Sequence, residues 1–154
     1  MRQVPRWPLW LGVAGLLPQV IVTAILALEP DLERARLAAA VALLYPTLIL
    51  TFLGGTWWGI AAAAPAAERR GGLGWLWVAA VLPTIGLMLL AAASAIFTIP
   101  ASASLMTVGA ALLLTPLVDA RLGPLAPRWW MALRLPLSLG LGGLTVAAAF
   151  LAPV

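Results

Sequence analysis

The sequence predicts an all-α, polytopic membrane protein: a bundle of five transmembrane helices that forms one domain over residues 1–154. Composition is the first reason, because 64% of the residues are hydrophobic and 9% are charged, whereas about a quarter of the residues in a soluble domain are charged. The second reason is the lengths of the uncharged runs, and the third is the positions of the arginines. Such a chain cannot build a polar shell, so we expect a lipid bilayer to surround it.

The first two spans follow from uncharged runs long enough to cross about 30 Å of hydrocarbon, which takes roughly 20 helical residues. The run from Trp7 to Leu28 has 22 residues, too many for the hydrophobic region of a signal peptide, so we expect a retained span. Glu29 to Arg36 is expected to form the first loop, with a helix start near Asp31. The run from Leu37 to Ala67 has 31 residues and should tilt, bend at Pro46 or emerge from the membrane.

The third and fourth spans come from one uncharged run of 48 residues, Gly71 to Val118. A single helix of that length would be about 72 Å long, more than twice the hydrocarbon thickness. We therefore expect two crossings with a turn at Phe97 to Ser104, and then a polar loop from Asp119 to Arg134. The predicted spans are 7–28, 37–62, 73–97, 101–118 and 135–152.

The arginines agree with five crossings and predict an orientation. Arg34 and Arg36 would lie on one side of the membrane, and the other seven on the opposite side: Arg2, Arg6, Arg69, Arg70, Arg121, Arg128 and Arg134. The positive-inside rule makes the seven-arginine side cytoplasmic. We expect a bacterial inner-membrane protein with a cytoplasmic N-terminus and a periplasmic C-terminus.

The eight tryptophans lie at the cytoplasmic ends of their predicted spans. The first expectation is that they anchor the helices at the lipid headgroups, and the alternative is that they form an aromatic ring around a ligand.

Several classes of chemistry are disfavoured by the composition. The sequence contains no histidine and no cysteine, so it lacks thiolate nucleophiles and the usual ligands of zinc and haem. No nucleophile–base pair, carboxylate pair or metal cluster can be assembled. The net charge of +4 comes from dispersed arginines, so we expect no nucleic-acid binding. We predict a protein without enzymatic activity, catalytic residues, metal or cofactor.

A layer of polar side chains is expected near the bilayer midplane. Gln19, the one amide inside a span, lies about 18 Å from the cytoplasmic tryptophans, and Tyr45, Thr47 and Thr107 lie at similar depths. The first expectation is that these groups hydrogen-bond between helices. The alternative is that they form the polar patch of a small apolar pocket beneath Trp58 and its neighbours.

Two further features predict contacts between helices. Gly55 and Gly59 form a GxxxG motif, which allows close approach of another helix, and Ser138 and Gly142 offer a matching face on the last span. We expect packing within the bundle, with homodimerisation or docking to a partner subunit as the alternative.

An ion pair is expected where the last two spans meet. Asp119 ends the fourth span, where a carboxylate opposes the helix dipole and favours a nearby cation. Arg134, at the start of the fifth span, and Arg121 are the candidates. We predict a pair that joins the last two helices at the cytoplasmic surface.

The sequence resembles a known family, domain of unknown function 3429, whose animal relative is called transmembrane protein 69. The resemblance covers nearly the whole chain and rests on LGVAGLLP (11–18), Tyr45 with FLGGTWWG (52–59), Leu82-Pro83, and Asp119 followed by PRWWMALRLPLSL (127–139). The family often has Tyr in place of Trp130 and His-Trp in place of the tryptophan pair at 57–58, so a ligand role at these positions has less support here. The resemblance implies a multi-pass inner-membrane protein and no particular activity.

Two functional hypotheses follow. The first is an accessory or assembly subunit, which acts through contacts between its helices and a partner membrane protein or a second copy of itself. The second is a binder or carrier of a small hydrophobic ligand, such as a quinone, an isoprenoid, a lipid or a tetrapyrrole. A channel is a third and weaker hypothesis, because hydroxyl-poor helices offer little lining for a wet pore.

Overall fold

The computed structural model describes residues 4–65 and 73–153, and nearly all of this part of the chain is helical. The elements are α1 (Arg6–Ala14), α2 (Leu17–Leu28), α3 (Leu32–Ala63), α4 (Gly74–Phe97), α5 (Ala101–Leu122), the 3-10 turn η2 (Gly123–Leu125) and α6 (Trp130–Leu151). Together α1 and α2 make the first of five segments that are long and apolar enough to cross a membrane. The predicted fold class is confirmed: the protein is an all-α, multi-pass membrane protein.

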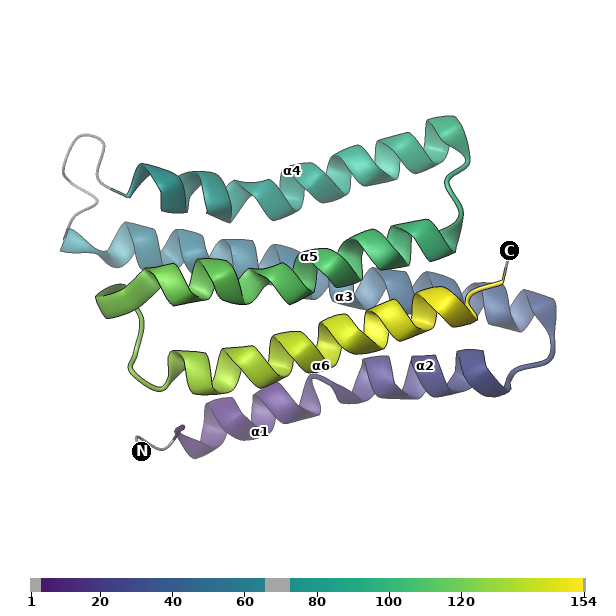
Figure 1. Ribbon diagram of the computed structural model, residues 1–154, viewed down its shortest axis with the longest axis horizontal. Helices are drawn as coiled ribbons and strands as arrows, with labels where there is room; N and C mark the ends of the chain where they lie inside the picture. Colours follow the sequence, from purple (N-terminus) through teal and green to yellow (C-terminus); the bar gives the residue numbers. More distant parts are fainter. Residues whose placement is uncertain (1–3, 66–72, 154) are drawn as a thin grey trace.

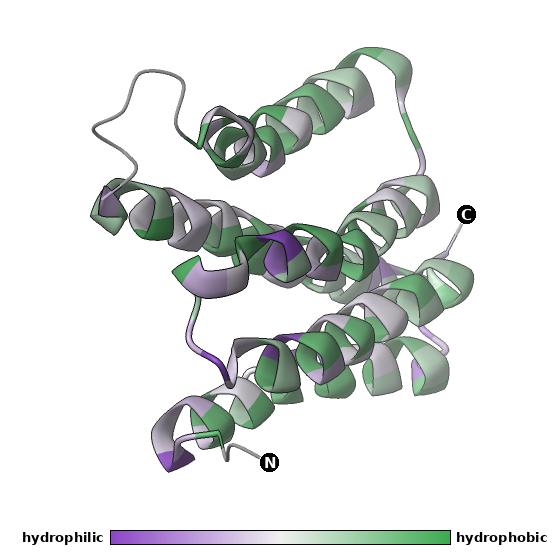
Figure 2. Cartoon of the chain, turned by 60° about the vertical axis from the view of Figure 1, so that its left-hand side comes forward, coloured by the Kyte–Doolittle hydropathy of each residue, from purple (hydrophilic) through white to green (hydrophobic). Residues whose placement is uncertain are grey.

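The five crossings run alongside one another in alternating directions (Figure 1). Helix α3 is central and contacts α2, α4, α5 and α6, while α5 packs most extensively against α6. Helix α4 lies at one edge of the bundle, and α1 with α2 lies at the opposite edge. Apolar residues dominate along all of the helices in Figure 2, and many large apolar side chains are exposed on the outside of the bundle, where lipid would cover them.

Helix α3 begins directly after Asp31, at the predicted helix start. The Asp31 carboxylate accepts a hydrogen bond from the backbone N–H of Arg34 at 2.9 Å, and this N-cap starts the helix at Leu32. Glu33 and Arg36 pair at 2.9 Å within the first turns. The expected loop at 29–36 therefore shrinks to its first residues. The helix continues through Pro46, and its 32 residues span about 48 Å.

The expected polar loop at 119–134 is also mostly helical. Helix α5 extends to Leu122, and α6 begins at Trp130, so Asp119 and Arg134 each lie about one turn inside a helix. The turn between α4 and α5 falls where it was predicted, with Pro100 directly before the first residue of α5. Of the seven arginines assigned to one side, Arg2, Arg69 and Arg70 lie outside the described residues.

The first crossing is interrupted between α1 and α2, at Gly15 and Leu16. Pro18 has no backbone N–H, so one carbonyl of the preceding turn loses its helical donor. At the break, the hydroxyl group of Tyr45 on α3 donates a hydrogen bond to the backbone oxygen of Gly15. A side chain of the central helix thus satisfies a carbonyl at the break, as broken helices in membranes require.

Candidate functional site

A buried carboxylate joins three helices at the tryptophan-rich end of the bundle. Asp119 on α5 is 1% exposed. Its Oδ1 atom accepts hydrogen bonds from the indole Nε1 atoms of Trp57 on α3 and Trp130 on α6, each at 2.9 Å. Its Oδ2 atom accepts from Nε of Arg134 on α6 at 3.0 Å. Hydrogen bonds to an ionised acceptor are stronger than neutral ones, so this group pins α3, α5 and α6 together.

The two indoles make the burial of this charge feasible. A buried carboxylate loses several kcal/mol of hydration, and a cation restores it only when the remaining lone pairs are also satisfied. Trp57 and Trp130 supply the two extra donors while their ring bodies remain in apolar surroundings. The predicted contact between Asp119 and Arg134 is thus present, and both side chains are buried between the helices.

Arg134 itself is incompletely satisfied. Only its Nε atom bonds to Asp119, and its buried Nη2 atom has no hydrogen-bond partner among the described residues. The guanidinium carbon lies 6.0 Å from the centroid of the Trp130 ring, within the range of a cation–π contact. A buried donor without a partner is unfavourable, especially a charged one, so the Nη2 atom can donate to one further acceptor.

Arg134 lines the larger of two cavities that flank the carboxylate. This cavity, which we call the α1–α3–α6 cavity, has a volume of about 470 Å³, within the size range of small-molecule sites. Along α6 it extends from Trp129 to Leu141, which is about 18 Å of helix. Its walls are Pro8, Leu11, Gly12, Gly15, Leu16, Tyr45, Ile49, Phe52, Leu53, Thr56, Leu112, Trp129, Trp130, Leu133, Arg134, Leu137, Ser138 and Leu141.

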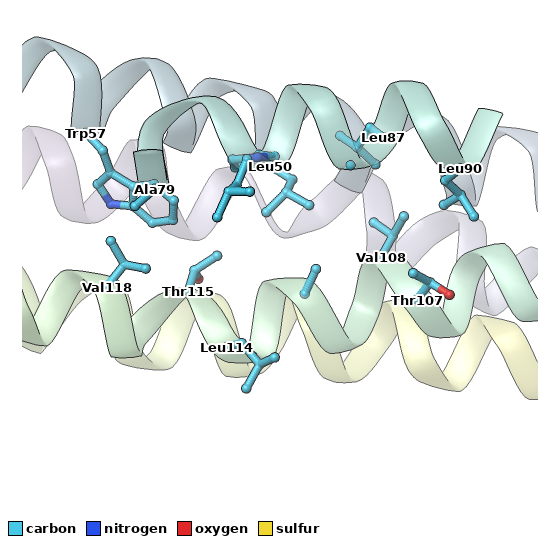
Figure 3. A pocket seen from close by; sticks show the side chains of 14 residues that line it. Leu50, Trp57, Ala79, Leu87, Leu90, Thr107, Val108, Leu114, Thr115 and Val118 are labelled. Atoms are coloured by element: carbon cyan, nitrogen blue, oxygen red, sulfur yellow. The ribbon is translucent and has the colours of Figure 1, made fainter. Parts of the chain in front are cut away.

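The second cavity lies between α3, α4 and α5 and has a volume of about 320 Å³. Figure 3 shows side chains of all three helices around it, with Thr107 and Thr115 as the polar members of an otherwise apolar wall. Both hydroxyl groups donate to backbone oxygens of their own helix. Trp57 also lines this α3–α4–α5 cavity. Asp119 therefore bonds one indole from the wall of each cavity.

Only part of the expected polar layer connects helices. Gln19 is fully buried, and its Nε2 atom donates to the backbone oxygen of Ala42 on α3 at 3.2 Å. With the bond from Tyr45, this contact ties the first crossing to α3. Thr47 and Thr107 instead donate to Leu43 and Ala103 of their own helices. Similar depth in the bilayer does not place side chains on facing sides of their helices.

The predicted ligand set does not form one pocket. Tyr45 lines the α1–α3–α6 cavity, Thr107 lines the α3–α4–α5 cavity, and Gln19 and Thr47 line neither. Trp58 is 51% exposed and makes an edge-on contact with Trp77 of α4, with 4.7 Å between ring centroids. The prediction that these side chains line one pocket is therefore wrong, because it rested only on their similar depth in the bilayer.

Gly55 and Gly59 do not pack against another helix of the bundle. Both are exposed, and a Cβ atom added at either would meet nothing within 4 Å. The close approach is instead made by Gly54, where a Cβ atom would collide with the backbone oxygen of Ala80 on α4. Neighbouring residues on a helix point about 100° apart, so the glycine next to the motif faces α4.

Ser138 and Gly142 do pack inside the bundle, but against α5 rather than α3. A Cβ atom on Gly142 would lie 3.1 Å from the backbone oxygen of Gly109, and the reverse distance is also 3.1 Å. The Ser138 and Thr115 hydroxyl oxygens are 3.0 Å apart. Three pairs therefore follow one another along what we call the α5–α6 seam: Gly109–Gly142, Thr115–Ser138 and Asp119–Arg134.

Trp57 and Trp130 are site residues that sequence reasoning missed. Their position near the span ends suggested headgroup anchoring, yet Trp57 is 3% exposed. The sequence did contain a signal for their bonds to Asp119. Both tryptophans lie at the same end of the predicted spans as Asp119, and a buried indole N–H needs an acceptor.

The fold and the site together define a class: a small multi-pass membrane protein whose five crossings enclose a buried Asp–Arg–Trp cluster between two cavities. The chain belongs to the DUF3429 family, described as a protein of unknown function, whose family model matches residues 4–150. No curated protein and no solved structure matches the chain.

Proposed function

We propose that this protein is a non-enzymatic membrane protein that binds a small lipophilic molecule in the α1–α3–α6 cavity. The observation that carries the proposal is Arg134, whose buried Nη2 atom lacks a partner while its side chain forms part of the cavity wall. Ligand sites are mostly apolar with a few polar groups that set orientation. This cavity has that composition, whereas the α3–α4–α5 cavity has no buried donor left without a partner.

The architecture around the cavity supports the proposal. The break at Gly15 gives the first crossing a bend beside α3 and α6, and at Gly12 the absence of a side chain lets Leu137 of α6 pack directly against α1 at the cavity wall. The distribution of arginines favours a cytoplasmic N-terminus, and we place the protein in a bacterial inner membrane. In that orientation the C-terminus is periplasmic and Arg134 lies near the cytoplasmic surface, while the rest of the cavity extends towards the midplane.

A pair of variants on α6 tests whether the cavity is occupied. Leu137→Trp adds bulk inside the cavity, whereas Leu139→Trp adds the same bulk on a side chain that is 52% exposed outside it. Mass spectrometry of organic extracts from the purified proteins should show a lipophilic molecule in the wild type and in Leu139→Trp, but not in Leu137→Trp. Equal amounts in all three, or none in the wild type, would contradict the proposal.

A second candidate is an accessory or assembly role, and one specific observation favours it. Gly55 and Gly59 form an open small-residue surface on α3 that no described helix covers, and such surfaces allow another helix to approach closely. A partner membrane protein or a second copy of the chain would fit there. Gly55→Leu/Gly59→Leu should then abolish co-purification of that partner from native membranes, whereas Gly143→Leu, at another open glycine, should not. A lone monomer from gentle detergent would count against this role.

A further inference from the structure

We propose that the ligand of the α1–α3–α6 cavity presents a neutral hydrogen-bond acceptor to Arg134, of the ring-carbonyl type that quinones carry. This inference rests on the proposed ligand-binding function and specifies its chemistry. Three features of the site lead to it: the hydrogen-bonding state of its polar groups, the charge of the buried pair and the shape of the cavity.

The hydroxyl protons at the cavity wall are already committed. Tyr45 donates to Gly15, and Thr56 donates to the backbone oxygen of Phe52 at 3.0 Å. Ser138 donates to Thr115, because the Thr115 proton itself goes to the backbone oxygen of Leu112. Arg134 is the buried donor that remains, and guanidinium groups donate but do not accept. A polar ligand group that contacts the Arg134 guanidinium must therefore accept a hydrogen bond.

The charge of the site favours a neutral acceptor. Asp119 and Arg134 are the only charged residues that are buried in the described part of the chain, and their charges, −1 and +1, sum to zero. An anionic ligand would leave the buried site with a net charge of −1 next to Asp119. A charge without its own counterion is costly in apolar surroundings. A carbonyl oxygen satisfies the donor without this cost.

The walls favour a flat ring with a hydrocarbon tail. Trp129 and Trp130 lie at the Arg134 end with their ring centroids 6.1 Å apart and tilted by 49°. Aromatic faces of this kind favour stacking with a planar group. Beyond them the cavity is lined mainly by leucine and isoleucine towards Leu141. About 470 Å³ spread along about 18 Å of helix describes a long slot, which suits a ring with a short isoprenoid chain.

Three matched probes test the acceptor directly. The wild-type protein in phosphatidylcholine nanodiscs is incubated with tritiated 2-methyl-3-prenyl-1,4-naphthoquinone, and empty nanodiscs correct for partitioning. The competitors are the same quinone unlabelled, the hydrocarbon 2-methyl-3-prenylnaphthalene and the anion 3-prenyl-2-naphthoate. The quinone should bind about tenfold to a hundredfold more tightly than the hydrocarbon, the range that one hydrogen bond to a charged donor supplies. It should also bind more tightly than the anion.

A double variant assigns the preference to the buried pair. Asp119→Asn/Arg134→Met removes both charges and the guanidinium donor, so no unpaired charge remains, and the amide oxygen at position 119 can still accept from the indoles of Trp57 and Trp130. Its preference for the quinone over the hydrocarbon should fall to about onefold, with hydrocarbon affinity nearly unchanged. If this variant does not fold, the three probe affinities of the wild type still decide the question.

The outcomes separate the two proposals. If the quinone and the hydrocarbon bind equally, and Leu137→Trp weakens both, ligand binding stands and the neutral-acceptor inference is overturned. The inference is also overturned if the naphthoate binds most tightly, or if the double variant keeps the preference. If no probe binds the wild type, both the inference and the proposed site fail.

Discussion

Helix α4 and the two helices of the α5–α6 seam are all apolar enough to cross a membrane, yet they are packed in different ways. Only two of the 24 residues of α4 are buried, Leu76 and Ala80. In α6, eight of 22 residues are buried, and they include Arg134, Ser138 and Thr145. Helix α4 presents large side chains such as Met88 and Leu89 to the outside, with exposed fractions of 75% and 66%.

The difference shows what drives helix association in a bilayer. Burying a leucine against another helix gains little there, because lipid tails are equally apolar, so close packing and interhelical hydrogen bonds decide the contacts. The α5–α6 seam has two glycines in mutual contact, a hydroxyl pair and an ion pair. Helix α4 has one such glycine contact, at Gly54, and one long oxygen–oxygen contact of 3.4 Å, between Ser94 and Ser104.

The two cavities repeat this contrast. The α3–α4–α5 cavity lies where α4 separates from α5, and its wall carries no unsatisfied donor. The α1–α3–α6 cavity lies beside the polar end of the seam, and Arg134 belongs to both. We expect lipid tails to fill the first cavity, whereas the proposed ligand would occupy the second.

The largest effect is expected at the ion pair of the seam. Asp119→Leu leaves Arg134 buried without a counterion, so the free energy of unfolding should fall by about 3–5 kcal/mol. Equilibrium unfolding in mixed detergent micelles measures this change. Asp119→Leu/Arg134→Leu is the control and should recover part of the loss, because no unpaired charge remains, while the indole N–H groups of Trp57 and Trp130 still lack their acceptor. A double variant as unstable as the single one would show that the pair itself stabilises the seam.

A smaller loss is expected at the close approach of α5 and α6. Gly142→Val places a Cβ atom 2.8 Å from Cγ of Leu113 and 3.1 Å from the backbone oxygen of Gly109, so the helices must separate. Overpacking of this kind costs about 2–3 kcal/mol, again measured by unfolding. Gly86→Val on α4 is the control, because it adds its side chain at the wall of the α3–α4–α5 cavity with nothing within 4 Å of the new Cβ atom. Equal losses would remove the proposed distinction between the two interfaces.

The contact of α4 with the rest of the bundle should depend on Gly54. Gly54→Val collides with the backbone oxygen of Ala80 and should destabilise the protein by about 1–2 kcal/mol. It should also reduce the near-ultraviolet circular dichroism of the Trp58–Trp77 pair, which joins α3 to α4. Gly55→Val, one residue away at an open position, should change neither quantity. An unchanged tryptophan signal in Gly54→Val would show that α4 is held by other contacts.

The smallest effect is expected for single hydroxyl groups. Ser138→Ala removes the 3.0 Å contact with Thr115 and should cost about 0.6 kcal/mol, the mean for such bonds between membrane helices. Ser94→Ala removes the 3.4 Å contact with Ser104, and its effect should be close to zero because the contact is long. Unfolding of both variants under the same conditions compares them. A larger loss for Ser94→Ala would reverse the ranking of the two interfaces.

The sequence predicted the depth and burial of individual residues better than it predicted which residues contact one another. Asp119 and Arg134 were placed together because their runs end at the same side of the membrane. Gly55 and Gly59 were misassigned because a GxxxG spacing does not say which helix face meets a neighbour. Gln19 is buried, as expected of an amide in a span, but its partner is a backbone oxygen of α3, and no side-chain pattern marks such an acceptor.

The sequence by itself determined that the chain crosses the membrane five times, and close to where each crossing begins and ends. That information is one-dimensional, because the length of an uncharged run is compared with a fixed hydrocarbon thickness. Only the tertiary structure decided which faces meet, why Trp57 and Trp130 bond to Asp119, and where the cavities lie. The physical reason is that these helices are apolar on all sides, so hydropathy sets no preferred rotation. Glycine contacts and buried hydrogen bonds set it instead, and they depend on two helices at once.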